Sequence, residues 1–238
     1  MSTVERRPPA PPTIPLLVDG QRLGQAEFHR RYEAMPPRTR AELVGGTVYM
    51  PSPMSADHGE STPDIIIWLG LYRRRTPGLR LADGATVVLD KFGEPQPDAL
   101  LRIEPELGGT CSVNEDNYLT GPPEMVVEVA KSSRLFDLGA KRTDYERAGV
   151  QEYIVVTLDP HDVHWYVRRA KKLVRMRLGR DGLYRSKVFP GLWLDPVALS
   201  RGDLDGVIAA LDRGLASPDH AAFVAKLAAA AARGTPGA

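Results

Sequence analysis

One carboxylate in this 238-residue chain lies within an apolar segment, where an acid is unfavourable unless a cation is close to it. Glu128 is the fourth residue of the run Met125–Ala130, which is otherwise apolar, closely follows two prolines and ends before Lys131. The length and β-branched content of this run predict a buried strand. Because burying an unpaired carboxylate costs several kcal/mol, we expect a positively charged side chain beside Glu128.

The residue best placed to meet Glu128 is Lys141, on a helix that the sequence predicts over residues 137–148. Asp137 is a typical N-cap residue, and Gly149 is typical of the position just past a helix C-terminus. At helical spacing, Lys141 shares one stripe with Leu138, Tyr145 and Ala148. We expect this stripe to face the sheet, which would bring the lysine ammonium to the buried glutamate.

The order and spacing of these residues resemble the Uma2 family of restriction-endonuclease-like nucleases, within the PD-(D/E)XK superfamily. The resemblance covers Arg40 to Asp195, about two-thirds of the chain. The residues that carry it are Glu128, Ser132-Ser133, Asp137, Lys141, Tyr145, Gly149-Val150 and Glu152-Tyr153. It implies an α/β fold with a restriction-endonuclease-like mixed central sheet flanked by helices, here with an added C-terminal β-hairpin region and a helical tail.

The resemblance also implies a metal-dependent endonuclease that hydrolyses phosphodiester bonds in DNA. The superfamily places its first metal-binding carboxylate after a proline at the start of a strand, which corresponds to Asp98. Asp98 and Glu128 would hold Mg²⁺ or Mn²⁺, with the backbone carbonyl of Val129 as a further ligand. Lys141 would orient the attacking water or offset developing charge, and Glu42 would complete the acidic cluster.

Three further residues are expected to assist this site: His58, Asp137 and Tyr145. His58 occupies the place where the family has a histidine before its first long helix, although a surface or capping role is equally expected. The literal Pro63-Asp64 pair falls at the predicted start of that helix, where an aspartate complements the helix dipole. We therefore do not expect Asp64 to be catalytic.

The lysine of the superfamily motif departs from its usual position. It usually lies two residues after the glutamate, where this chain has Ala130. Lys131 is adjacent, but strand alternation directs it to the opposite face, so Lys141 is assigned instead unless a bulge turns Lys131 inward. The alternative to a catalytic role is a structural pair of Glu128 and Lys141 that fixes the helix on the sheet.

The distribution of charge suggests where DNA could bind. The net charge is only +1, but residues 162–190 contain nine Lys or Arg against two Asp and so carry +7. A basic patch of this kind can bind phosphates. The side chains expected to contact nucleic acid are Arg168, Lys171, Arg175 and Arg177. The alternative is a solvated β-hairpin that uses its charge to protect a sheet edge.

The remaining predicted elements surround these residues. Ahead of the central strand, the sequence predicts a helix over Leu23–Met35, a hairpin over Arg40–Met50, a helix starting at Ser61–Pro63, a strand pair over Leu79–Leu89, a strand after Asp98 and a polar loop near the site over Leu107–Leu119. Beyond it, strands are predicted over Val150–Leu158, Val163–Val167, Leu173–Leu178 and Tyr184–Val188, and helices over Leu204–Leu211 and Ala221–Ala232.

The predicted organisation is a restriction-endonuclease-like domain over residues 16–212, preceded by a disordered proline-rich arm over 1–15 and followed by a helical tail over 213–238. The composition is 42% hydrophobic and 26% charged, and neither a membrane-length apolar run nor an apolar signal segment is present. We expect a cytoplasmic protein without a membrane partner.

The lone cysteine, Cys111, excludes an internal disulfide and a multi-cysteine zinc site, and we expect it to pack rather than react. The expected partners are DNA and a second copy of the chain, since cutting both strands suits a dimer, and no small-molecule cofactor is expected. A binding module that keeps the nuclease fold without turnover, and recognises nucleic acid or another protein, is the alternative function.

Overall fold

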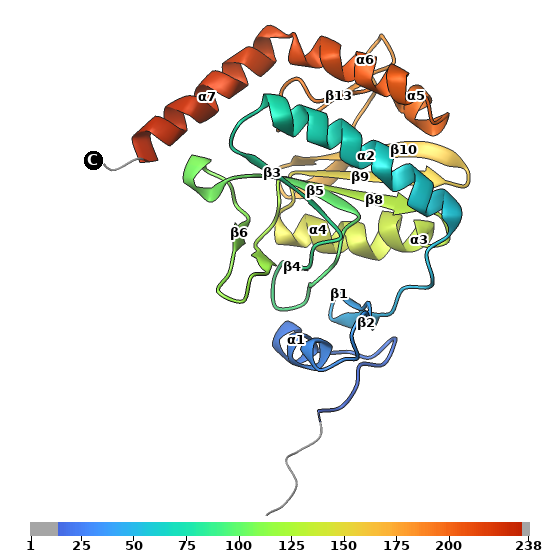
Figure 1. Ribbon diagram of the computed structural model, residues 1–238. Helices are drawn as coiled ribbons and strands as arrows, with labels where there is room; N and C mark the ends of the chain where they lie inside the picture. The colour runs from blue at the N-terminus through green and yellow to red at the C-terminus, as the bar shows by residue number, and fades with distance from the viewer. Residues whose placement is uncertain (1–13, 235–238) are drawn as a thin grey trace, which may run out of the picture.

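The computed structural model describes residues 14–234, and nearly all of the predicted arm over 1–15 lies outside this range. Its centre is a six-stranded sheet in the order β11-β10-β9-β8-β5-β3 (Figure 1). The strands are β3 Leu79–Asp83, β5 Ala99–Ile103, β8 Met125–Ala130, β9 Glu152–Leu158, β10 His161–Arg169 and β11 Lys172–Arg175. The pair β8–β9 is parallel and the other neighbouring pairs are antiparallel, so the sheet is mixed, as predicted.

Helices cover both faces of this sheet, which is why β8 and β9 are buried along their whole length (Figure 1). One face carries α2 Ala56–Arg75, α5 Pro196–Ser200 and α6 Leu204–Leu215. The other face carries the crossover between β8 and β9, which consists of α3 Arg134–Phe136, the π-helical turn η2 Asp137–Lys141 and α4 Arg142–Ala148.

Strand alternation assigns the residues of β8 to these two layers. Met125, Val127 and Val129 pack in the core with Trp68 of α2 and Trp165 of β10. Val126 and Ala130 pack in the other core, with Tyr145 of α4 and Tyr153 of β9. Glu128 has the same parity as Val126 and Ala130, so its side chain faces the crossover helices.

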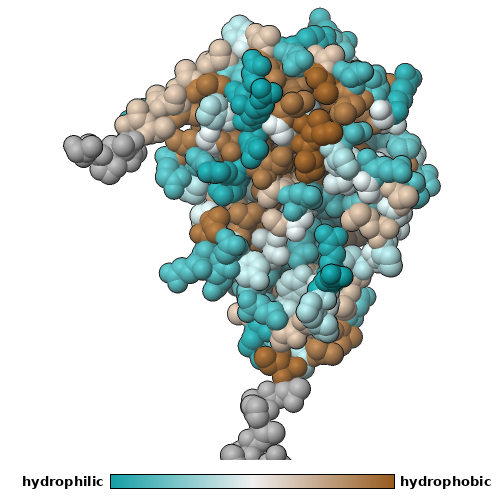
Figure 2. Space-filling model, viewed as in Figure 1, coloured by the Kyte–Doolittle hydropathy of each residue, from teal (hydrophilic) through white to brown (hydrophobic). Residues whose placement is uncertain are grey.

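Smaller elements complete the molecule. A hairpin of β1 Glu42–Val44 and β2 Thr47–Tyr49 packs with α1 Gln25–Glu33 around a third apolar cluster. The others are β4 Val87–Val88, η1 Pro105–Leu107, β6 Ser112–Val113, β7 Leu119–Thr120, β12 Tyr184–Arg185, β13 Trp193–Leu194 and α7 Pro218–Gly234. The helix α7 is pale brown in Figure 2 because most of its exposed residues are alanine.

Two N-terminal predictions were wrong in detail. The first long helix begins at Ala56 rather than at Ser61–Pro63, because the side chain of Ser55 accepts the backbone N–H of His58 as an N-cap. Pro63 therefore lies inside α2, and His58 lies in its first turn rather than before it. The expected strand pair over Leu79–Leu89 does not form, because β3 pairs with β5 while β4 pairs with β7.

The C-terminal predictions also needed correction. The crossover helix begins at Arg134, so Asp137 is not its N-cap but lies within the helical segment, with φ −68° and ψ −42°. Gly149 ends the helix in the left-handed region at φ 107°, as expected for a glycine there. The β10–β11 hairpin is not an added region, because its strands form the edge of the main sheet. The predicted strand over Leu173–Leu178 stops at Arg175.

Candidate active site

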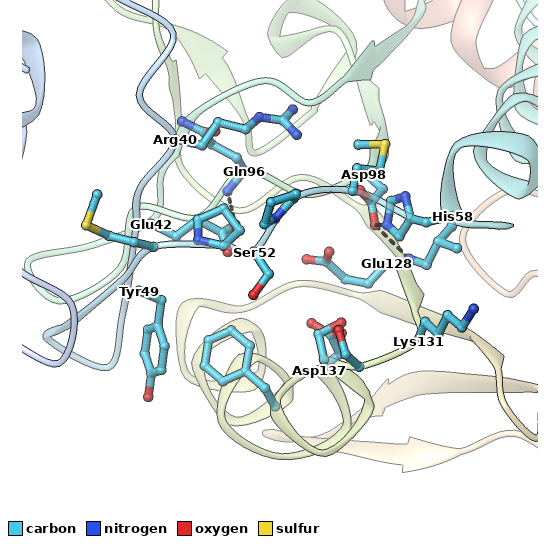
Figure 3. Close-up of a pocket in the computed structure, with 18 of the residues that line it drawn as sticks. Arg40, Glu42, Tyr49, Ser52, His58, Gln96, Asp98, Glu128, Lys131 and Asp137 are labelled. Carbon is cyan, nitrogen blue, oxygen red and sulfur yellow. Dashed lines mark hydrogen bonds and ion pairs between the residues drawn. The ribbon is translucent and has the colours of Figure 1, made fainter. Parts of the chain in front are cut away.

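A cavity of about 1280 Å³ opens between the β1–β2 hairpin, the start of α2 and the ends of β5 and β8 (Figure 3). Seven of the eight residues predicted for catalysis, metal binding or an auxiliary role line it: Glu42, His58, Asp98, Glu128, Val129, Asp137 and Lys141. The eighth, Tyr145, lies behind Glu128 and contacts it. The structure therefore brings together residues that are as much as 99 positions apart in the chain.

Strand register accounts for the meeting of the two carboxylates expected to bind metal. In the antiparallel β5–β8 pair, Ala99 is opposite Val127 and Leu100 is opposite Val126. Extending this register by one residue puts Asp98 opposite Glu128. Side chains opposite each other on antiparallel strands share a face and lie within reach of the same ligand.

Lys141 is the centre of the buried part of the site. Its Nζ atom lies 3.0 Å from Glu128 Oε1, 3.0 Å from Glu42 Oε1 and 3.9 Å from Asp137 Oδ1, and its side chain is only 6% exposed. The Tyr145 hydroxyl donates a second hydrogen bond to Glu128 Oε1, at 2.9 Å. The predicted pairing of Lys141 with Glu128 is therefore present in the fold, while the role of the pair stays a prediction.

The ionisation of the cluster follows from burial and from an excess of acids. Burial would lower the pKa of Lys141, but the carboxylates of Glu128, Glu42 and Asp137 outweigh it and raise that pKa. Burial raises the pKa of Glu128 well above its usual value and that of Asp137 to about 6, although Lys141 opposes both shifts. One ammonium among several acids leaves the cavity with a negative potential that favours cations.

Asp98 is held in place by two neighbours. Its Oδ2 atom accepts the backbone N–H of Val129 at 2.7 Å and lies 3.3 Å from His58 Nε2. The hydrogen bond to Asp98 raises the pKa of His58. His58 Nδ1 is buried and has no hydrogen-bond partner in the described part of the chain.

Whether a metal ion fits this site depends on which carboxylate oxygens accept no hydrogen bond from the protein. Among residues 14–234, no group of three or more His, Cys, Asp or Glu side chains is arranged to hold a metal ion. However, Asp98 Oδ1 and Glu128 Oε2 accept no hydrogen bond from the described residues, since the partners of both side chains use the other oxygen. Two free carboxylate oxygens fit a hard cation that keeps several of its waters.

Lys131 does not enter the acidic cluster. Its ammonium pairs with Asp57 at the mouth of the cavity, and its side chain is 43% exposed. This agrees with the alternation argument that led us to expect Lys141 beside Glu128.

The four residues predicted to contact nucleic acid lie outside the cavity lining. Arg168 donates to the backbone carbonyl of Glu146 at 2.8 Å, and Arg175 pairs with Asp162 at 3.0 Å. Lys171 and Arg177 are exposed, and Arg177 lies beyond the end of β11, although the strand predicted over Leu173–Leu178 would have included it. The predicted polar loop over 107–119 also contributes no lining residue and instead contains β6.

Other lining residues were not identified from the sequence, among them Arg38, Arg40, Tyr49, Gln96 and Phe136. Glu42 could have indicated two of them. Arg40 lies two positions before it along an extended segment, and Tyr49 is its partner in the hairpin register. The Tyr49 and Phe136 rings lie 4.1 Å apart between centroids, and the Gln96 backbone N–H donates to Glu42 Oε1 at 2.6 Å.

Comparison with known proteins identifies the family. Residues 25–198 match the model of the Uma2 family, described as "Putative restriction endonuclease". A crystal structure from Anabaena variabilis ATCC 29413, of "a putative nuclease belonging to DUF820", is similar with a TM-score of 0.53 and 10% identity, covering 76% of this chain and 97% of that one. At this identity the likeness concerns the fold alone. No curated protein matches the chain. Within the described residues, no helix is long and apolar enough to span a membrane. With the family model covering most of its length, the chain belongs to the Uma2 family.

Proposed function

We propose that this protein is a metal-dependent endonuclease that hydrolyses phosphodiester bonds in DNA. The observation that supports this most directly is the pair of free carboxylate oxygens, Asp98 Oδ1 and Glu128 Oε2, beside the buried ammonium of Lys141. Membership of a family described as nucleases supplies the substrate class. The proposal therefore depends on the geometry for the site and on the family for the reaction.

Asp98 and Glu128 would hold Mg²⁺ or Mn²⁺, with the Val129 carbonyl as a further oxygen ligand and waters in the other positions. When bound, such an ion supplies an activated water and offsets charge on the phosphate. His58 and the Val129 N–H orient Asp98 by holding Oδ2, and Tyr145 orients Glu128 by holding Oε1. In each case the hydrogen bonds leave the second oxygen available to a ligand.

Lys141 would orient the attacking water or offset the charge that develops on the phosphate. Glu42 and Asp137 assist by keeping Lys141 protonated and by fixing its ammonium beside Glu128. An ammonium that is already positioned needs no reorganisation when charge develops. DNA as the partner and a homodimer that cuts both strands belong to the same proposal.

Plasmid cleavage by matched aspartate variants tests the proposal. The wild type should cut supercoiled plasmid in Mg²⁺ or Mn²⁺ and not in a chelator, and Asp98→Asn should cut at least about 100-fold more slowly. The control is Asp64→Asn, which changes another Pro-Asp pair of the chain, on α2 and outside the cavity lining. Equal activity in the two variants, or cutting that survives chelation, would contradict the proposed roles.

The second candidate function is a binding module without turnover. It is favoured by one observation: Lys141 already lies 3.0 Å from both Glu42 and Glu128, so the acids are neutralised in part without a metal. Calorimetry with millimolar Mn²⁺ separates the two functions, because a ligand that binds the folded state raises the melting temperature. If the protein is a metal-dependent nuclease, Mn²⁺ should raise the melting temperature of the wild type and not that of Asp98→Asn. If Glu128 and Lys141 form a purely structural pair, Mn²⁺ should not raise the melting temperature of the wild type.

A further inference from the structure

Among the described residues, five cationic side chains line the cavity, and they differ in whether an acid pairs with them. Lys141 is paired with Glu128 and Glu42, Lys131 with Asp57, and His58 with Asp98. The other two are Arg38 and Arg40. Within residues 14–234, neither of these arginines forms a hydrogen bond or an ion pair, and both are exposed.

The backbone that carries the two arginines is held by hydrogen bonds and by the burial of the next residue. Thr39 donates its backbone N–H and its hydroxyl to the carbonyl of Pro36, and the Tyr32 hydroxyl donates to the carbonyl of Thr39. Ala41, which follows Arg40, is fully buried in the cluster under the β1–β2 hairpin. A guanidinium on such an anchored segment loses less conformational entropy on binding an anion than one on a mobile loop.

Arg38 adopts a backbone conformation that a side chain disfavours. Its φ of 71° lies in the left-handed region, where glycine is at no disadvantage and most residues are strained. Strain of this kind concentrates at binding and catalytic sites. The backbone conformation would favour glycine at position 38, so it does not explain the arginine. What arginine adds over glycine is the unpaired guanidinium group.

Arg40 lies on the side of the cavity that is formed by the segment leading to β1. Arg40 is two residues before Glu42, so in the extended segment leading to β1 both side chains face the cavity. In Figure 3, Arg40 lies over Gln96, with Glu128 and Asp98 between it and Lys131. The acids would repel a phosphate that approached them alone, whereas a guanidinium at the mouth binds phosphate oxygens in bidentate geometry.

We propose that Arg38 and Arg40 bind backbone phosphates of the nucleic-acid strand beside the scissile bond and so hold that strand over the acidic cluster. The nature of the ligand rests on the proposed nuclease function. This assigns phosphate binding to the two arginines instead of the β10–β11 hairpin. Arg168 and Arg175 of that hairpin have intramolecular partners and lie outside the cavity lining.

Binding of a fluorescein-labelled DNA duplex in Ca²⁺ at several salt concentrations tests this. Arg38→Ala/Arg40→Ala should weaken binding about tenfold or more and make the negative slope of log K against log salt shallower by about 2, the effect of losing two phosphate contacts. The matched control is Arg175→Ala/Arg177→Ala, which removes the same charge from the hairpin. A loss that is equal in the two double variants, or confined to the hairpin variant, would overturn the proposal.

Two further measurements separate this proposal from its alternatives. Arg38→Gly relieves the backbone strain, so it should keep the melting temperature while weakening binding as Arg38→Ala does; unchanged affinity would remove Arg38 from the site. In plasmid cleavage, the arginine double variant should raise KM about tenfold and leave kcat within about threefold. An unchanged KM in an active enzyme would overturn the arginine assignment alone, whereas a wild type that binds through the arginines without cutting would overturn only the nuclease function.

Discussion

Two glutamates are buried in neighbouring strands of the central sheet, and their surroundings differ. Glu152 of β9 is 0% exposed and meets no cation from residues 14–234. Its four hydrogen-bond donors are the backbone N–H groups of Lys187 and Val188, the Ser186 hydroxyl and the Trp165 indole. Glu128 of β8 instead meets the ammonium of Lys141 and the hydroxyl of Tyr145, and it lines a cavity.

This difference shows which features distinguish a candidate site from a structural acid. Burial raises the pKa of both side chains, that of Glu152 to about 7, so a perturbed pKa alone does not separate them. The donors to Glu152 engage both of its oxygens and tie the segment 186–188 to β9 and β10. The donors to Glu128 engage one oxygen, and the other is available to a ligand from the cavity.

Removing the cation should have the largest effect on stability. Lys141→Met leaves Glu128 and Glu42 buried without a positive partner, which should lower the free energy of unfolding by about 3–5 kcal/mol in urea denaturation. The matched control is Lys131→Met, at an exposed pair with Asp57, where a change below about 1 kcal/mol is expected.

A second variant shows whether the loss comes from the unpaired acid. Lys141→Met combined with Glu128→Gln removes one of the uncompensated charges, so it should recover part of the stability lost in Lys141→Met alone. If the double variant is less stable than Lys141→Met, the loss comes from packing rather than charge, and Glu128 would then resemble Glu152 in needing no cation.

The elements that could be predicted are those with strong local signals. The apolar run Met125–Ala130 bounded by prolines gave the strand β8 at its observed bounds, and the stripe containing Lys141 faces the sheet as expected. The position of Asp98 followed from the family motif, and the register of β5 against β8 is the physical reason it meets Glu128.

The features that could not be predicted depend on contacts distant in sequence or on irregular backbone. The π-helical turn over Asp137–Lys141 has no signature in the residues, so the N-terminus of the crossover helix was misplaced by three positions. Glu152 belonged to the family motif, but its structural role depends on backbone donors 35 and 36 residues away. The sequence likewise could not show that Arg38 and Arg40 are unpaired, because this depends on which cations the nearby acids pair with in the fold.

The pH dependence of stability should reveal Glu152 as an acid without a cation. Its pKa in the folded state is raised from 4.5 to about 7. The stabilisation of the folded state by protonated Glu152 is therefore fully present below pH 4.5 and is lost as the pH rises toward 7. Relative to Glu152→Gln, the wild type should therefore lose about 3 kcal/mol between these limits, at 1.36 kcal/mol per pKa unit. Urea denaturation of both proteins at several pH values measures this difference.

Taking the difference between the two proteins removes the other groups that titrate in this range. Asp137, whose pKa is raised to about 6, and His58, whose pKa is also raised, contribute equally to wild type and variant. A pH-independent difference would mean that the four donors hold Glu152 ionised throughout, because hydrogen bonds to a carboxylate favour its charged form.

The smallest expected effect is that of Glu128→Gln on the protein without metal. Lys141 keeps Glu42 at 3.0 Å, and the glutamine carbonyl can still accept from Tyr145, so the free energy of unfolding should change by less than about 1 kcal/mol. The same variant should lose the rise in melting temperature that Mn²⁺ gives the wild type, since it lacks one of the two carboxylates. Unchanged stability together with a lost metal response would assign Glu128 to ligand binding. A loss above about 2 kcal/mol, with the Mn²⁺ response intact, would make it a structural acid like Glu152.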